Sequence, residues 1–166
     1  MNFHTTSLYN DFRIFAKYKK LMQIALSEAK SSLLSFDVPI GALVADESGE
    51  VVAKAHNLRN GNNSPLAHAE LLAIEEAGRK LETYHLEKCT LVTTLEPCIM
   101  CAGAILNSKI GRVVFGSWNE KSGAVSGKFD VFRDFEGVFQ KTDVIGGVLE
   151  KETSAILKEF FEGRRG

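Results

Sequence analysis

The chain has little cysteine, no excess of charge of one sign and no long apolar run. Three cysteines among 166 residues cannot build a disulfide framework. The longest uncharged apolar stretches, 38–45 and 99–106, are much shorter than the roughly 20 residues of a membrane-spanning helix. The N-terminal segment has no continuous apolar stretch and no small-residue cleavage site, so no secretory signal is predicted. These absences exclude a disulfide-stapled secreted domain and a membrane-spanning protein, and they favour a cytoplasmic address.

The charges of the chain nearly balance. Lys and Arg together number 20 against 21 Asp and Glu, which leaves a net charge of −1 at pH 7. A globally basic surface, the simplest sign of nucleic-acid binding, is therefore lacking, and any RNA substrate must meet a local positive patch. The length of 166 residues and the apolar share of 45% predict one globular domain over residues 1–166.

Apolar periodicity and turn residues predict alternating helices and strands. The expected elements are a helix over 13–34, a hairpin over 38–57 with its turn at 46–49, a loop over 60–65, helices over 68–80, 98–107 and 150–162, and strands over 89–94, 112–116 and 142–149. Pro97 suits the first position of the helix that follows it. The later half predicts a largely parallel sheet with helices on both faces, and ligand sites at the carboxyl ends of its strands.

Three side chains have the pattern of zinc ligands. Cys98 and Cys101 lie three residues apart at the start of a predicted helix, so they share one face, and the helix N-terminus favours their thiolate forms. His68 opens another predicted helix. One imidazole and two thiolates leave the fourth tetrahedral position of a zinc ion open. That pattern is typical of a catalytic site, because structural zinc sites are usually closed by four protein ligands.

Glu70 constrains the geometry of such a site. Residues two apart deep in a helix point roughly 200° away from each other. His68 and Glu70 can therefore serve one metal only if their helix begins near residues 67–68. We predict that two helix N-termini converge on the metal, one with His68 and Glu70 and the other with the thiolates. A carboxylate beside the metal can take a proton from water, donate one to a ring nitrogen and assist the departure of ammonia.

Neither motif is specific by itself. The H-x-E triplet is frequent on solvated helix faces, and C-x-x-C also occurs in thioredoxin-like redox pairs and in structural zinc sites. A structural site would need a fourth ligand, and the remaining cysteine, Cys89, is predicted to be a small core residue. Together, H-x-E and P-C-x-x-C form the signature of zinc-dependent nucleobase deaminases.

Several longer runs extend these two motifs. They are HNLR at 56–59, AHAE at 67–70, TLEPCIMCAGAI at 94–105, SKIGRVVFG at 108–116, EKSGA at 120–124, GGVL at 146–149 and EFF at 159–161. Together they resemble the bacterial tRNA-specific adenosine deaminases over about residues 19–163. The resemblance implies a three-layer α/β/α sandwich of the cytidine deaminase-like type, with a five-stranded mixed sheet and helices on both faces. It also implies a homodimer, one Zn²⁺ per chain, and conversion of adenosine to inosine at the wobble position of a tRNA anticodon stem-loop.

The resemblance also assigns roles to individual residues. The ligands would be His68, Cys98 and Cys101, and Glu70 would be the proton shuttle. Asn57 would read the flipped-out base, and the alternative is a strand-end Asn that caps a loop. The residues expected near the nucleic-acid backbone are Asn119, Lys121, Arg164 and Arg165, and for the three basic residues ordinary surface charge is the alternative.

Three positions depart from the family pattern. The family usually has Asp at the position of Asn119, Gly-Ser-Leu at Ser126–Lys128, and His near Gln140. All three departures concern substrate contacts and leave the metal ligands intact.

Two other functions remain open from the sequence. A deaminase of a free base or nucleoside, such as guanine, cytosine or cytidine, would share the whole zinc argument, and the EKSGA run and C-terminal match argue against it. A zinc-bound RNA-binding subunit without catalysis would have no need of Glu70.

Overall fold

The computed structural model describes residues 12–127 and 129–164. Its elements are α1 (Phe12–Ala29), a 3₁₀ helix (Lys30–Ser35), β1 (Gly41–Ala45), β2 (Val51–His56), α2 (Ala69–Leu81), β3 (Thr90–Leu95), α3 (Ile99–Asn107), β4 (Arg112–Ser117), α4 (Val131–Asp134), β5 (Asp143–Ile145) and α5 (Glu150–Glu162). No helix in these described ranges has the length and apolarity needed to cross a membrane.

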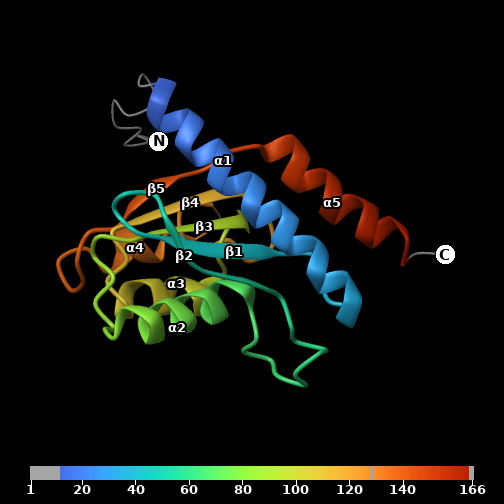
Figure 1. Ribbon diagram of the computed structural model, residues 1–166, viewed down its shortest axis with the longest axis horizontal. Helices are drawn as coiled ribbons and strands as arrows, with labels where there is room; N and C mark the ends of the chain where they lie inside the picture. The colour runs from blue at the N-terminus through green and yellow to red at the C-terminus, as the bar shows by residue number, and fades with distance from the viewer. Residues whose placement is uncertain (1–11, 128, 165–166) are drawn as a thin grey trace.

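The five strands form one mixed sheet in the order β2-β1-β3-β4-β5. Strand β1 runs antiparallel to both β2 and β3, whereas β3, β4 and β5 run parallel to one another. Helices α1 and α5 cover one face of the sheet, and α2 and α3 cover the other (Figure 1). The predicted three-layer arrangement is therefore confirmed, with the parallel part of the sheet in the later half of the chain.

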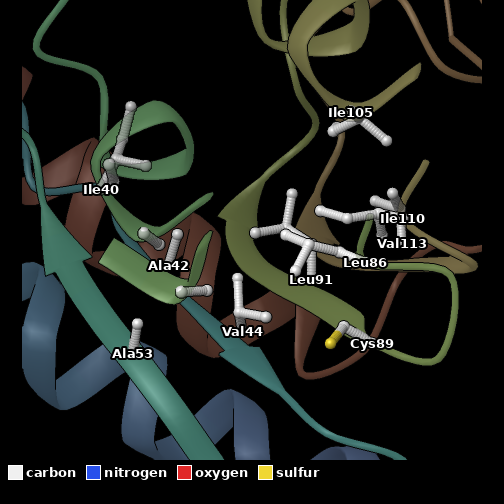
Figure 2. Close-up of a cluster of buried hydrophobic side chains, with 13 residues drawn as sticks. Ile40, Ala42, Val44, Ala53, Leu86, Cys89, Leu91, Ile105, Ile110 and Val113 are labelled. Carbon is white, nitrogen blue, oxygen red and sulfur yellow. The ribbon is translucent and has the colours of Figure 1, made fainter. Parts of the chain in front are cut away.

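The central strands bury side chains on both faces, as a sheet between two helical layers requires. On β1, Ala42 and Val44 pack toward α2 and α3 in one cluster with Leu91 (Figure 2). The alternate residue Leu43 packs toward α1 together with Val92. This two-sided burial fixes the register of β1 and β3, and so fixes the end of the sheet where α2 and α3 begin.

The structure corrects some of the predicted boundaries. The opening helix is α-helical only to Ala29 and then tightens to 3₁₀ geometry. Pro97 is not the first helical residue, because Cys98 has the extended backbone of an N-cap and the helix starts at Ile99. Strand β5 has only three residues. The glycine that follows it, Gly146, lies against the Phe115 ring, where an added Cβ would be 2.5 Å from Cζ.

The short helix α4 was not predicted. Asp130 caps it by accepting a hydrogen bond from the backbone N–H of Arg133 at 3.1 Å. One turn of helix has no repeating apolar pattern, so periodicity could not reveal it.

Candidate active site

Two helices of the same layer begin at the site. His68 is the N-cap of α2 and Cys98 is the N-cap of α3, and both have extended backbones. Strand β2 leads through a loop into α2, and β3 leads directly into α3, so both helices start at the same end of the sheet. The structure therefore has the two converging helix N-termini that the spacing of His68 and Glu70 required.

The three predicted ligand atoms lie at metal-binding separations. The distances are 3.8 Å between the Sγ atoms of Cys98 and Cys101, 3.8 Å from Cys98 Sγ to His68 Nδ1, and 3.6 Å from Cys101 Sγ to His68 Nδ1. A regular tetrahedron with Zn–S bonds of about 2.3 Å and a Zn–N bond of about 2.0 Å has S–S and S–N edges of about 3.8 Å and about 3.5 Å. The residues present fit a zinc ion, and they are the only such group found in the described part of the chain.

The two thiols of the site have strongly unequal proton affinities. A hydrogen bond from the Cys101 thiol, together with His68, lowers the pKa of Cys98 to about 3. The same hydrogen bond raises the pKa of Cys101, and burial raises it further. The hydrogen bond to Cys98 also raises the pKa of His68. A metal ion bound at this point would displace the protons that the two thiols and the imidazole share.

Glu70 lies beside the ligands in the first turn of α2 and is buried. Burial raises the pKa of its carboxyl group. Its Oε2 atom is buried without a hydrogen-bond partner among the residues described. An unpartnered buried carboxylate oxygen is costly, so it indicates a position where a water or substrate atom belongs.

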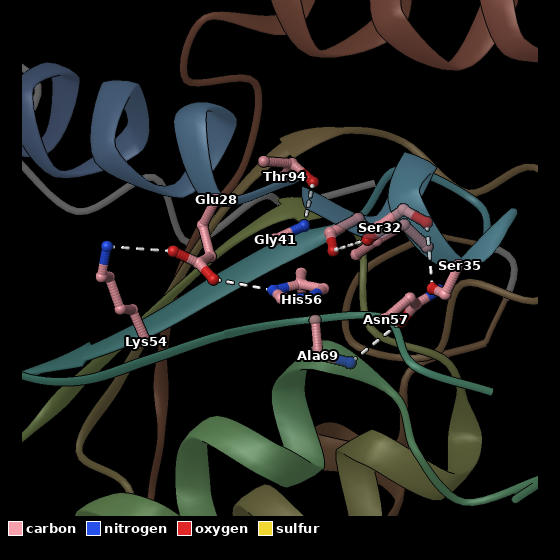
Figure 3. Close-up of polar contacts among 10 residues, drawn as sticks. Glu28, Ser32, Ser35, Gly41, Lys54, His56, Asn57, Ala69 and Thr94 are labelled. Carbon is pink, nitrogen blue, oxygen red and sulfur yellow. Dashed lines mark hydrogen bonds and ion pairs between the residues drawn. The ribbon is translucent and has the colours of Figure 1, made fainter. Parts of the chain in front are cut away.

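Asn57 is buried at the end of β2 and is tied to α2. Its Oδ1 accepts a hydrogen bond of 2.9 Å from the backbone N–H of Ala69, the residue between His68 and Glu70 (Figure 3). The neighbouring His56 points to the opposite face, where Nδ1 lies 2.7 Å from Glu28 on α1. His56 is therefore no candidate ligand. This hydrogen bond is compatible with the alternative role of Asn57, a strand-end Asn that caps a loop, and it also holds the side chain next to His68 and Glu70.

A groove opens beside Asn57, and Arg164, just past the end of α5, is one of its lining residues. The groove is also lined by Phe36 and Arg59, among others. The Arg164 guanidinium lies 4.3 Å from the centre of the Phe160 ring and donates to the Phe36 carbonyl at 2.6 Å. Arg59 was not predicted as a site residue, although it lies in the HNLR run.

Asn119 and Lys121, which were also predicted to lie near the RNA, are on the loop after β4. Asn119 Oδ1 accepts a hydrogen bond from the Ser122 backbone N–H at 3.1 Å, so Asn119 closes a turn. Lys121 is exposed on that turn, and Gln140 is exposed before β5. Arg165 and Lys128 lie outside the described residues.

Two buried carboxylates that were not predicted hold the loops around the site. Asp37 accepts hydrogen bonds from the backbone N–H groups of Asn60 and Gly61 and from the Ser35 hydroxyl, at 2.7–3.3 Å. It thereby holds the loop before α2. Glu96 holds the loop after β4 in the same way, by accepting hydrogen bonds from its backbone N–H groups. Glu96 stands inside the TLEPC run, which marks the position without revealing what the side chain contacts.

Asp37 gives the β2–α2 loop a pH-dependent stability. Burial raises the pKa of its carboxyl group, but the hydrogen bonds to the charged form outweigh burial and leave the pKa below its usual value. A lowered folded-state pKa stabilises the fold above the unfolded-state value of about 4, and this stabilisation is lost as pH falls through the folded-state pKa. The Tm difference between wild type and Asp37→Asn should therefore be largest near neutral pH and shrink in acid. A constant difference would contradict this role.

The chain has close relatives of known activity. Residues 16–117 match the family described as the cytidine and deoxycytidylate deaminase zinc-binding region. The tRNA-specific adenosine deaminase of Bacillus subtilis (strain 168) is 42% identical over 144 residues, which cover 87% of this chain and 88% of that protein.

Solved structures confirm the predicted deaminase fold. One, from a study of A-to-I editing by tRNA:A34 deaminases at the wobble position of transfer RNA, has a TM-score of 0.77 and 36% identity over 83% of this chain and 99% of that chain. A guanine deaminase from Nitrosomonas europaea has a TM-score of 0.75 and 27% identity over 86% and 83% of the two chains. The chain belongs to the zinc-dependent cytidine and deoxycytidylate deaminase family and, within it, to the tRNA-specific adenosine deaminases.

Proposed function

We propose that this protein converts adenosine to inosine at the wobble position of a tRNA anticodon by zinc-dependent hydrolysis. The observation that carries the proposal is the convergence of α2 and α3, which places His68, Cys98 and Cys101 within 4.8 Å of one another beside a buried Glu70. Family membership supports adenosine as the base.

Each side chain of the site has one task in this proposal. His68, Cys98 and Cys101 hold the ion, which when bound polarises a water and lowers its pKa toward about 7. Glu70 accepts a proton from the attacking water and donates one to a purine ring nitrogen. A C–O bond forms at the carbon that bears the amine. Glu70 then takes the second proton from the new hydroxyl group and gives it to the amine, and the C–N bond breaks to release ammonia. The products are inosine and ammonia.

Asn57 is proposed to position the base. Its Oδ1 is occupied by the Ala69 N–H, so the amide group is fixed and its Nδ2 is the donor left for a base edge. Because Ala69 lies between His68 and Glu70, a base held by Asn57 is aligned with both the metal ligand and the proton shuttle. Such pre-alignment lowers the entropic part of the barrier.

RNA binding is proposed to rest on a local basic patch. The net charge of −1 rules out a globally basic surface. Arg59 and Arg164 line the groove beside Asn57, and Lys121 is exposed on the loop after β4. With Arg165 they would contact phosphates of the anticodon loop, whose bases are already unpaired.

The deciding experiment compares substrates. An anticodon stem-loop with adenosine at the wobble position should be converted to inosine with release of ammonia. Free adenosine, cytidine, cytosine and guanine should react far more slowly, because they lack the phosphate contacts that position the base. Rapid turnover of a small substrate, with an inert stem-loop, would identify a free-base or nucleoside deaminase instead. No turnover of any substrate by zinc-loaded protein would identify a binding subunit.

Stem-loop affinity measured at several salt concentrations tests the role of the groove. Arg164→Ala should weaken stem-loop binding and flatten the slope of log affinity against log salt by about 0.7–0.9, as the loss of one phosphate contact requires. Zinc content should stay unchanged. Lys151→Ala is the matched control, because this exposed cation lies at the other end of α5, roughly 20 Å away along the helix. Equal salt slopes for wild type and Arg164→Ala would remove Arg164 from the interface.

The proposal also covers the oligomeric state of the protein and its location in the cell. We infer a homodimer, the assembly that the resemblance to the tRNA-specific adenosine deaminases implies. We infer a cytoplasmic location because the free thiols of Cys98 and Cys101 need a reducing compartment to stay available as ligands. Light scattering of the purified protein tests the dimer.

A further inference from the structure

Glu96 is a buried carboxylate that the proposed reaction does not use. Along the chain it lies between the end of β3 and the metal ligand Cys98, and its exposed fraction is 1%. No lysine, arginine or histidine of the described residues forms an ion pair with it. A buried charge needs other compensation, and backbone N–H groups are the groups that supply it here.

Three backbone N–H groups of one loop donate to this carboxylate. Oε2 accepts from Asn119 at 3.1 Å, and Oε1 accepts from Ser126 at 3.2 Å and from Gly127 at 2.6 Å. The donors come from both ends of the 119–127 loop, which therefore wraps around the carboxylate. Lys121 lies exposed within this loop.

Two glycines let the loop approach so closely. A Cβ added at Gly123 would lie 2.1 Å from Glu96 Oε2, and one at Gly127 would lie 2.4 Å from the same atom. Both distances are far below contact, so the carboxylate occupies the space that a side chain would fill. The close approach of Glu96 therefore explains why the EKSGA run has a glycine at Gly123.

The same loop is joined to the metal-ligand segment by its backbone. The Ala124 N–H donates to the Pro97 carbonyl at 3.0 Å, and Cys98 and Gly123 form a β-bridge. Glu96, Pro97 and Cys98 are consecutive, so one short segment contributes a metal ligand and also carries the anchor of the loop.

We propose that Glu96 is a positioning residue that holds the 119–127 loop, with Lys121, at the mouth of the active site. The inference rests on the proposed function, because it assigns the loop to the RNA substrate. Glu96 touches neither substrate nor metal and acts through the backbone of the loop. Its loss should weaken RNA binding and leave the chemistry and the metal intact.

The primary test is Glu96→Gln, which keeps the size of the side chain. An amide offers one acceptor oxygen, so in either orientation its NH₂ group faces a backbone N–H donor. The KM for the anticodon stem-loop should rise by about tenfold, as it should in Lys121→Ala, because the loss of a hydrogen bond to a charged group releases the loop that holds Lys121 near the RNA. The kcat should change by less than about twofold, because the lost interaction supports ground state and transition state equally. Zinc should remain at about one ion per chain.

A double-variant comparison separates positioning from general structural damage. In the wild-type background, Lys121→Ala should raise the KM and flatten the salt slope by about 0.7–0.9. In the Glu96→Gln background, Lys121→Ala should have little further effect, because Lys121 is no longer held near the RNA. The matched control background is Asp37→Asn, since Asp37 is also a buried loop anchor but holds the other loop. There, Lys121→Ala should keep its full effect.

Gly127→Ala supplies a second variant should Glu96→Gln fail to fold. Gly127 is exposed, so the replacement spares the core, and its Cβ would push the loop away from an intact carboxylate. The same rise in KM is expected. A wild-type KM in Glu96→Gln or Gly127→Ala, loss of zinc in Glu96→Gln, or a full Lys121→Ala effect in the Glu96→Gln background would each overturn the inference. Wild-type turnover of the stem-loop tests the proposed function separately.

Discussion

Cys98→Ala or Cys101→Ala is expected to remove the zinc and abolish deamination. Each replacement leaves two protein ligands, and the edges of 3.6–3.8 Å show that the three ligand atoms form one face of a tetrahedron. Elemental analysis of the purified protein should find about one zinc per chain in wild type and far less in either variant. Ammonia release from the stem-loop should fall to the background rate.

Cys89→Ala is the matched control for these two variants. Cys89 is also a free cysteine, but it is buried in the hydrophobic cluster between the sheet and α2 and α3 (Figure 2) and does not belong to the group of metal-ligand residues. Its replacement should lower stability and leave zinc content and turnover near the wild-type values. Full zinc together with intact activity in Cys98→Ala or Cys101→Ala would falsify the ligand assignment.

Glu70→Gln is expected to separate chemistry from binding. Glu70 is not one of the three ligand residues, so zinc content should remain at about one ion per chain. Stem-loop affinity should also be nearly unchanged, because Glu70 is buried in the first turn of α2 and offers no surface to the RNA backbone. Turnover should fall by about 10²–10⁴-fold or more, the usual effect of removing a general acid/base.

Single-turnover kinetics and zinc analysis on the same preparation check this expectation. The matched control is Glu75→Gln, since Glu75 lies on the same helix but is exposed. The control should match wild type in zinc, affinity and rate. If Glu70→Gln instead lost its zinc, Glu70 would belong to the ligand set and the proton shuttle would have to be sought elsewhere.

Local pattern determined most of the fold and the chemical core of the site. Amphipathic spacing predicted α1, the Ala, Leu and Glu content predicted α2, and β-rich runs predicted β1 to β4, because helices and strands each favour their own residues and periods. The ligands could be predicted for the same reason. A helix N-terminus is a local feature of the chain. The spacing of Cys98 and Cys101, and of the H-x-E triplet at residues 68–70, therefore predicts which of these side chains can face one metal ion.

Only the tertiary structure decided how the loops around that core are held. Glu96 meets its hydrogen-bond donors 23–31 residues away along the chain, and Asp37 meets Asn60 and Gly61 at separations of 23 and 24. Contacts at such distances follow no period, so neither carboxylate could be distinguished from a surface charge by pattern. Arg164 reaches Phe36 across 128 residues for the same reason. The residues that perform the chemistry were thus determined locally, whereas those that present the substrate depend on loops that only folding brings together.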